Sequence, residues 1–336
     1  MLRHLRLLFD NFTLILIAVV AAATLFPAHG QGAVFFEYIT SAAIALLFFM
    51  HGAKLSREAI IAGASHWRLH ILVFACTFAV FPLIGIALQP VLTPLLGVSL
   101  YTGVLFLCAL PGTVQSAIAF TSLARGNIPA AVCSASASSI IGIVVTPLLV
   151  AVLLNMDTGS AVSPLDSIIS ISAQLLLPFA VGHFMRPLIG RFIDKHRSML
   201  GKIDQGSILL VVYTAMSASV VEGLWHTVSP TQLAILTVVS TLLLALILWL
   251  TSWLGRRLGF NREDRITIVF CGSKKSMATG VPMANVLFTG AMLGPALLPL
   301  MIFHQIQLMV CAVIAQRMRA QIEPIGTPAA AGNSQA

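Results

Sequence analysis

Long, uninterrupted apolar stretches constrain the fold of this sequence more than any other feature. A helix needs about 20 apolar residues to cross a bilayer core of about 30 Å. Only 9% of the residues are charged, whereas a soluble domain carries about 25%. We therefore exclude a soluble enzyme, a disordered protein and a nucleic-acid binder, and the continuity of the stretches argues against a β-barrel. We expect an all-α polytopic membrane protein with ten transmembrane helices, at 11–28, 36–53, 69–89, 100–123, 129–154, 166–187, 206–224, 231–254, 266–288 and 294–316.

The basic residues alternate between the gaps that separate these spans. Gaps after odd-numbered spans contain almost no Lys or Arg, whereas gaps after even-numbered spans are rich in both. The positive-inside rule then predicts a multi-pass protein of the cytoplasmic (inner) membrane with both termini in the cytoplasm. The net charge of +8 is explained by this orientation and by contact with anionic lipid of the bilayer. Every Lys and Arg falls on the inner side except Lys274 and Lys275.

Ten spans divide into two sets of five at the acidic gap around residues 157–166. Because five is odd, two related halves would have opposite orientations, which is the inverted-repeat plan of secondary transporters. We predict a first five-helix repeat at 1–155 and a second, inverted repeat at 156–320. The remaining segment, 321–336, is polar and small, and we expect a disordered cytoplasmic tail there.

The fourth span of each half is interrupted by helix-breaking and hydroxyl residues. Span 4 contains LFLCALPGTVQSAIAF, and span 9 contains IVFCGSKKSMATGVPMANVLF. Breaks at corresponding positions of two halves are the best sequence pointer to a substrate or ion site. An ordinary proline kink is the alternative for either span alone. The matched pair favours a site built from spans 4 and 9.

Polar residues of spans 4, 5, 9 and 10 fall at similar depths. With a rise of about 1.5 Å per residue, Gln115, Ser139, Lys274 and His304 each lie about 14–15 Å from a membrane edge. Close helix packing through small residues explains part of the serine run in span 5. We predict a substrate or ion site made of residues from this layer: Thr113, Gln115, Ser116, Ser134, Ser138, Ser139, Ser273, Lys274, Lys275, Ser276, Thr279, His304 and Gln305.

Lys274 and Lys275 carry the sharpest signal in this layer. A lysine at mid-membrane costs about 2.5–3.5 kcal/mol on insertion scales and is functional by default. The alternative is that both lysines snorkel to the cytoplasmic face. No acidic residue is predicted at their depth, so hydroxyls, amide oxygens, backbone carbonyls and a bound anion are the available partners. We expect His51 at the membrane interface, and His304 either at the site or as a hydrogen-bonded core histidine.

The cysteines point to no further chemistry. All five lie inside apolar stretches without pairing or ligand spacing: Cys76, Cys108, Cys133, Cys271 and Cys311. We interpret them as small buried hydrophobes and expect no disulfide and no cofactor. No spacing typical of a nucleophile and base is found either, which argues against an enzyme.

Several of these segments resemble one known family. PGTVQSAIAFTSLARGN, followed by a serine-rich helix that ends in TPLL, resembles the bile acid:sodium symporter family. GSKKSMATGVPMANVLF and IFHQIQLMVCAV are similar to its bacterial, SBF-like branch. The resemblance covers about residues 8–318. It implies a core domain of spans 3–5 and 8–10 with crossing, unwound spans 4 and 9, and a panel domain of spans 1, 2, 6 and 7.

The resemblance also implies an ion site. The positions that match sodium ligands are Gln115, Ser116, Ser134, Ser138 and Ser139. Span 9 departs from the sodium-coupled pattern, because its Glu–x–Gly–x–Gln motif is replaced by Ser273–Met277 with two lysines. We hypothesise that the ammonium of Lys274 or Lys275 takes the place of a sodium ion, held by serine, glutamine and carbonyl oxygens. Two coupling ions, sodium and a proton, are left open by the sequence.

Three functions are compatible with this sequence. The first is secondary transport of a small organic anion by alternating access, with a cleft lined by residues such as Gln174, Tyr213 and Thr214. The second is cation/proton antiport, which ranks lower because such antiporters use an aspartate at mid-membrane. The third is a non-transporting regulator of ion homeostasis, which would leave the paired breaks without a use.

Overall fold

The computed structural model describes residues 11–54, 66–154, 164–288 and 290–321, and within these ranges it contains helices and no strands. The helices, in chain order, are α2 (Asn11–Leu25), α3 (Gln31–Lys54), α5 (Trp67–Ala75), the π-helical turn η1 (Cys76–Val80), α6 (Phe81–Ala87), α7 (Gln89–Ala109), α8 (Gln115–Leu123), α9 (Ile128–Leu153), α10 (Pro164–Lys195), α11 (Arg197–Val221), α12 (Leu224–Thr227), α13 (Pro230–Arg257), α14 (Arg262–Gly272), α15 (Met277–Leu287), the 3₁₀ turn η2 (Gly290–Met292) and α16 (Leu293–Ala320). All but one residue of the predicted tail, 321–336, lie outside the described ranges.

Each predicted span overlaps one or more of these helices. By length and composition, seven described segments are able to cross a membrane: Gln31–Lys54, Trp67–Ala87, Gln89–Ala109, Ile128–Leu153, Ser198–Val221, Pro230–Arg257 and Gly290–Ala320. Several long apolar helices in one chain bear out the predicted all-helical, polytopic membrane protein.

Several predicted boundaries are wrong, two of them at the start of a span. Residues 90–99 were expected to form a gap, but α7 begins at Gln89 and includes them, because proline is accepted in the first helical turn. Gly97, with φ of +77°, then redirects this helix, and the side chain of Gln232 donates to the freed carbonyl of Leu96 at 2.9 Å. The span predicted at 206–224 also begins earlier, at Arg197, since charged residues there lie within a helix rather than in a loop.

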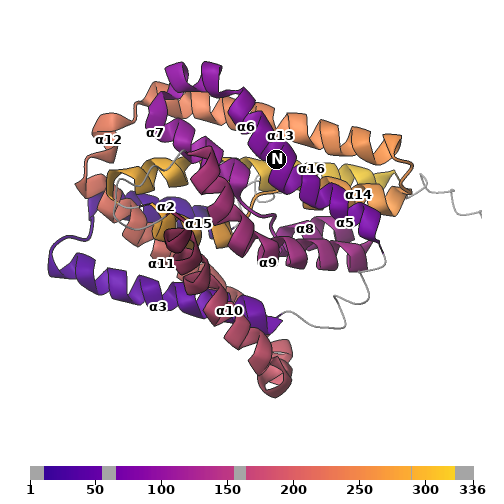
Figure 1. Ribbon diagram of the computed structural model, residues 1–336, viewed down its shortest axis with the longest axis horizontal. Helices are drawn as coiled ribbons and strands as arrows, with labels where there is room; N and C mark the ends of the chain where they lie inside the picture. Colours follow the sequence, from indigo (N-terminus) through magenta and orange to yellow (C-terminus); the bar gives the residue numbers. More distant parts are fainter. Residues whose placement is uncertain (1–10, 55–65, 155–163, 289, 322–336) are drawn as a thin grey trace, which may run out of the picture.

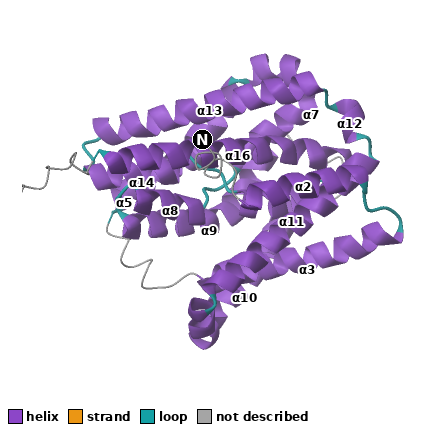
Figure 2. Cartoon of the chain, turned by 180° about the vertical axis from the view of Figure 1, so that it is seen from behind, coloured by secondary structure: helices purple, strands orange, loops and turns teal. Residues whose placement is uncertain are grey.

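The helices pack in two groups (Figure 1). In the first group, α3 lies along α10, and α11 packs against α2 and α3. In the second group, α7 packs against α16, α13 against α14 and α16, and α8 against α9 and α14. Figure 2 shows α2 and α11 between α3 and the helices around α16. The contacts of α11 with α15 and α16, and of α10 with α9, join the two groups.

Candidate functional site

Two non-helical segments, 110–114 and 273–276, interrupt the second group of helices. The first begins where Leu110 leaves α7 in an extended conformation, as expected of a residue that precedes proline. The two segments touch, because the N–H of Ser276 donates to the carbonyl of Pro111 at 2.9 Å. We call the contact between these segments the crossing. Both helix breaks predicted from the sequence are therefore present, and they meet in space.

Lys275 holds the crossing together. Its side chain is fully buried, and the ammonium donates to the carbonyls of Thr77 at 2.8 Å, Cys108 at 2.7 Å and Leu110 at 2.7 Å. An ammonium has three donors, so all of them are used. The Phe81 ring centroid lies 4.1 Å from the same nitrogen, within cation–π range. The charge is thus satisfied without a carboxylate.

The fold supplies these three carbonyls in two ways. The last carbonyls of a helix have no intrahelical partner and carry the negative end of its dipole, which is the position of Cys108 and Leu110 at the end of α7. Thr77 lies in η1, where the π-helical turn departs from the regular hydrogen-bond ladder. A cation is therefore favoured at the point where these elements meet.

Lys274 is also fully buried, but it has fewer partners. Its ammonium donates to the Ser116 hydroxyl at 3.1 Å and lies 3.8 Å from the centroid of the Phe120 ring. Ser116 in turn shares a hydrogen bond with Thr113 at 2.9 Å. Both contacts of Lys274 come from α8, and the hydrogen-bonded one, Ser116, lies in its first turn, where the helix dipole disfavours a cation. The two lysines are therefore not equivalent.

An amide from α16 holds the backbone of the second break. Gln307 accepts from the N–H of Lys275 at 2.9 Å and donates to the carbonyl of Lys275 at 2.8 Å. His304 lies beside it, with its Nδ1 2.9 Å from the Gln307 amide nitrogen. The two hydrogen bonds from Gln307 fix the backbone of Lys275 and so direct its side chain toward the carbonyls of Thr77, Cys108 and Leu110.

Two adjoining cavities lie between the helix groups. The larger has a volume of about 510 Å³ and the smaller about 290 Å³. They share part of their lining, namely His51, Val114, Gln115, Ser139 and Asp204. The smaller cavity reaches the crossing, since residues of both breaks line it. The N-terminal ends of α8 and α15 therefore open onto one space.

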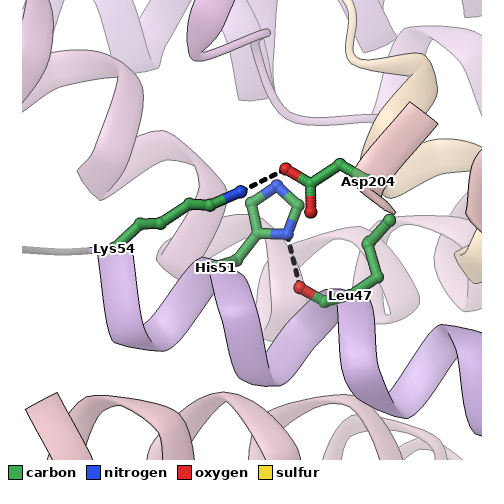
Figure 3. A network of polar contacts seen from close by, with 4 residues as sticks. All are labelled: Leu47, His51, Lys54 and Asp204. Carbon is green, nitrogen blue, oxygen red and sulfur yellow. Dashed lines mark hydrogen bonds and ion pairs between the residues drawn. The ribbon is translucent and has the colours of Figure 1, made fainter. Parts of the chain in front are cut away.

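A cluster of titratable side chains faces the same space from the first helix group (Figure 3). Lys54 forms an ion pair with Asp204, and the Nδ1 of His51 donates to the carbonyl of Leu47 at 2.7 Å. Asp204 is only 4% exposed, and its Oδ1 has no hydrogen-bond partner among the described residues. The cluster comes from α3 and α11, opposite the crossing.

The structure gathers about half of the predicted site residues at the smaller cavity. Two of them, Ser139 and Thr279, are buried and carry hydroxyl oxygens without a partner among the described residues. Such atoms can receive a solute without losing an existing hydrogen bond. The predicted residues that line this cavity are Thr113, Gln115, Ser116, Ser139, Ser276, Thr279 and His304.

Other predicted residues have contacts elsewhere. Ser134 bonds the Nδ1 of His70 at 2.6 Å, and Ser273 donates to a carbonyl of its own helix at 2.6 Å. Ser138 accepts from the N–H of Gly112 at 3.1 Å and so supports the first break. Gln305 is half-buried and lines neither cavity. Of the five positions proposed for sodium, Gln115, Ser116 and Ser139 line the smaller cavity, whereas Ser134 and Ser138 bond the partners just named.

Two of the residues expected to line a cleft, Tyr213 and Thr214, line neither of the two cavities. The hydroxyl of Tyr213 donates to the carbonyl of Phe26 at 2.9 Å, and Thr214 bonds Thr40 at 2.7 Å. Both therefore join α11 to neighbouring helices. The side chain of Gln174 lies outside the described part of the chain.

Sequence reasoning missed Gln307 and Asp204. Gln305 was predicted for the site, whereas Gln307 was not. The two residues are two positions apart on one helix and point in different directions, so only one of them can face the crossing. Asp204 was assigned to a gap. The buried residues Leu200, Ile208 and Val211 share its helix at helical spacing, and this pattern predicts that Asp204 shares their buried face.

Replacing Lys274 by methionine is expected to change stability only slightly. The variant loses a hydrogen bond from an ammonium, worth about 1.5 kcal/mol, and a cation–π contact with Phe120, worth about 0.5–1 kcal/mol, but it no longer buries a charge, which offsets these losses. Thermal unfolding of the purified protein in detergent measures this effect. A loss of several kcal/mol would contradict the distinction drawn between the two lysines.

Long apolar helices, two touching breaks and a cavity beside them that is lined partly by polar side chains define the class of this protein, a polytopic membrane transporter. The profile of the SBF-like CPA transporter family matches residues 10–320, so the chain belongs to this family. The family consists of transporters rather than enzymes, and it is related to the bile acid:sodium symporters.

Three relatives illustrate its range. The protein PA2026 of Pseudomonas aeruginosa is 62% identical over 93% of both chains. The symporter candidate YfeH of Escherichia coli is 56% identical over 94% of this chain and 95% of its own. Sodium/bile acid cotransporter 7-B of Xenopus laevis is 30% identical over 94% of this chain and 93% of its own.

Proposed function

We propose that the chain carries a small organic anion across the cytoplasmic (inner) membrane by alternating access. The N-terminal ends of α8 and α15 open onto the smaller cavity, and each carries the positive end of a helix dipole. Broken helices that point N-termini at an anionic group are a recurring device of secondary transporters. Unpartnered hydroxyls in the same cavity add donors for a carboxylate.

We also propose the finer architecture that such a mechanism needs. Besides the seven segments named above, α2, α10 and the pair α14–α15 each span the bilayer, which gives ten transmembrane spans with both termini in the cytoplasm. Residues 1–155 and 156–320 are inverted repeats, and each contains one of the two breaks. The first helix group is the panel and the second is the core, so the cavities lie between two bodies able to move relative to each other.

The observation that carries the proposal is the position of the Lys275 ammonium. In broken-helix transporters, unwound carbonyls and helix C-terminal ends coordinate the coupling cation. In this chain, the carbonyls of Thr77, Cys108 and Leu110 hold a covalently attached cation instead. A sodium ion would have to displace it. We infer that transport is independent of sodium and that a proton is the coupling ion.

Cation/proton antiport is the second candidate, because Asp204 is a buried carboxylate beside the cavities with one oxygen that has no partner in the described part of the chain. The sequence had argued against antiport because no such aspartate was predicted. An antiporter would exchange protons for a metal cation at this carboxylate and would need no organic substrate.

Separately imposed gradients test both candidates in proteoliposomes. We expect labelled carboxylates (pyruvate, succinate and benzoate) to accumulate when the lumen is alkaline, and a sodium gradient alone to have no effect. Accumulation driven by sodium, or no uptake of any carboxylate, would contradict the proposal. A lumenal pH dye that responds to added sodium or potassium without any carboxylate would establish the antiporter instead. Empty liposomes provide the control.

A further inference from the structure

The titratable cluster on α3 and α11 has a geometry that suits exchange of partners. The ion pair of Lys54 and Asp204 joins two helices of the first group, with Lys54 at the wall of the larger cavity and Asp204 at the wall of both. The two partners differ in exposure, since the side chain of Lys54 is 26% exposed and that of Asp204 is 6% exposed. The ammonium is thus the more accessible partner, on the side of the larger cavity, whereas the carboxylate lines both cavities with little exposed surface.

We propose that this ion pair is an exchangeable carboxylate subsite, in which a proton on Asp204 releases Lys54 to bind the carboxylate of the transported anion. The inference rests on the proposed function and names the group that receives the substrate's charge. Its occupant is an organic carboxylate, because a single ammonium on a flexible stem can replace one carboxylate partner by another at the same distance.

The exchange balances in atoms and in charge. A hydronium ion from the acidic aqueous side gives its proton to a carboxylate oxygen of Asp204 and leaves as water, and the hydrogen bond from Lys54 to Oδ2 breaks. The ammonium then donates to an oxygen of the arriving carboxylate. Before the step, the ammonium of Lys54 and the carboxylate of Asp204 sum to no net charge. After it, Asp204 is neutral, and the ammonium and the carboxylate of the bound anion again sum to none. A membrane interior penalises unpaired charge, so a step that keeps the site neutral is favoured.

His51 is placed to serve as the proton relay of this step. A carbonyl oxygen only accepts, so the Nδ1 of His51 carries a proton toward Leu47. The other ring nitrogen, Nε2, is then the atom that gains and loses a proton. The ring lies beside both Lys54 and Asp204, and His51 lines both cavities (Figure 3).

The other charged or titratable groups near the cluster contact other partners. On α10, Asp194 also lines the larger cavity, but it pairs with Arg186 at 3.6 Å. From the second helix group, His304 faces the smaller cavity beside Gln307. Lys274 lies behind Ser116 and bonds its hydroxyl. Among the described residues, Lys54 is the one lysine or arginine that lines either cavity.

A binding assay on the purified full chain tests the proposal. Thermal stabilisation by potassium salts of pyruvate, succinate and benzoate is compared with potassium chloride, at about pH 5.5 and about pH 8. We expect wild-type protein to bind at least one carboxylate more tightly at the lower pH. Asp204→Asn should bind it equally well at both values, because Lys54 is then permanently released. Lys54→Met should weaken binding at low pH about tenfold or more.

Two further variants keep the result decisive. Lys202→Met removes an exposed cation from the same helix as Asp204 and should behave as wild type. Lys54→Met combined with Asp204→Asn removes both charges, so no unpaired charge remains to prevent folding, and it should bind weakly and without pH dependence. The proposal is overturned if Lys54→Met keeps wild-type affinity and pH profile, or if Asp204→Asn keeps the pH dependence.

The outcome separates this inference from the proposed function. Wild-type protein that binds and transports a carboxylate, with Lys54 and Asp204 variants that do the same at every pH, overturns the subsite alone. Wild-type protein that neither binds nor transports any of the three carboxylates overturns both.

Discussion

Replacing Lys275 by methionine is expected to lower the free energy of unfolding by about 3 kcal/mol or more. The variant leaves the carbonyls of Thr77, Cys108 and Leu110 buried without their donor, and each unsatisfied buried acceptor costs about 1–3 kcal/mol. The costs do not add fully, because the variant also avoids burying a charge. Lys275 links η1 and the first break to the second break through these carbonyls. Without this link the crossing should loosen, and transport should be lost.

Thermal unfolding in detergent, together with uptake in proteoliposomes, checks this expectation. Lys274→Met is the matched control, because it removes an equally buried lysine that makes a single hydrogen bond. Lys275→Arg retains the charge but presents a planar fork to three carbonyls that surround one point, so it should not restore stability. A Lys275→Met protein as stable as wild type would show that the three carbonyls need no cation.

The sequence predicts the helices and the breaks because both signals are local. A run of about 20 apolar residues needs no partner to be recognised, and proline and glycine interrupt a helix wherever they fall. Pro111 and Gly112 in span 4, and the Gly272 to Ser276 stretch in span 9, therefore mark both segments of the crossing through residue type alone. The prediction that Lys274 and Lys275 are buried rests on the same local argument.

The partners of these lysines were not predictable, because they depend on non-local contacts. The carbonyl of Thr77 is available through a π-helical turn, and although Pro82 marks an irregular helix there, no local signal shows which residue the carbonyl faces. Asp204 was missed because a charge near the end of an apolar stretch usually marks a loop. Only the packing of α11 against α3 turns that residue toward Lys54 and the cavities.

The contact between α3 and α10 gives the second large expected effect. A Cβ atom on Gly182 would overlap the backbone carbonyl of Phe49, and a Cβ atom on Gly52 would overlap the carbonyl of Phe179. The obstacles are backbone atoms, so neither helix can yield by moving a side chain. Small residues at such contacts let membrane helices approach closely, and packing is the main force that holds them together.

Gly182→Val is therefore expected to separate α3 from α10 and to cost about 3 kcal/mol or more, with little folded protein recovered from membranes. Gly206→Ala on α11, where an added Cβ meets nothing within 4 Å, is the matched control and should be neutral or slightly stabilising. Size-exclusion chromatography and thermal unfolding of the detergent-solubilised protein measure the difference.

Lys54 follows this contact on α3, and the adjacent Ala53 carbonyl accepts from Arg186 at 2.6 Å. A displaced α3 would thus also break the Lys54–Asp204 pair, whereas a Gly182→Val protein with wild-type stability would show that the helices pack less closely than described.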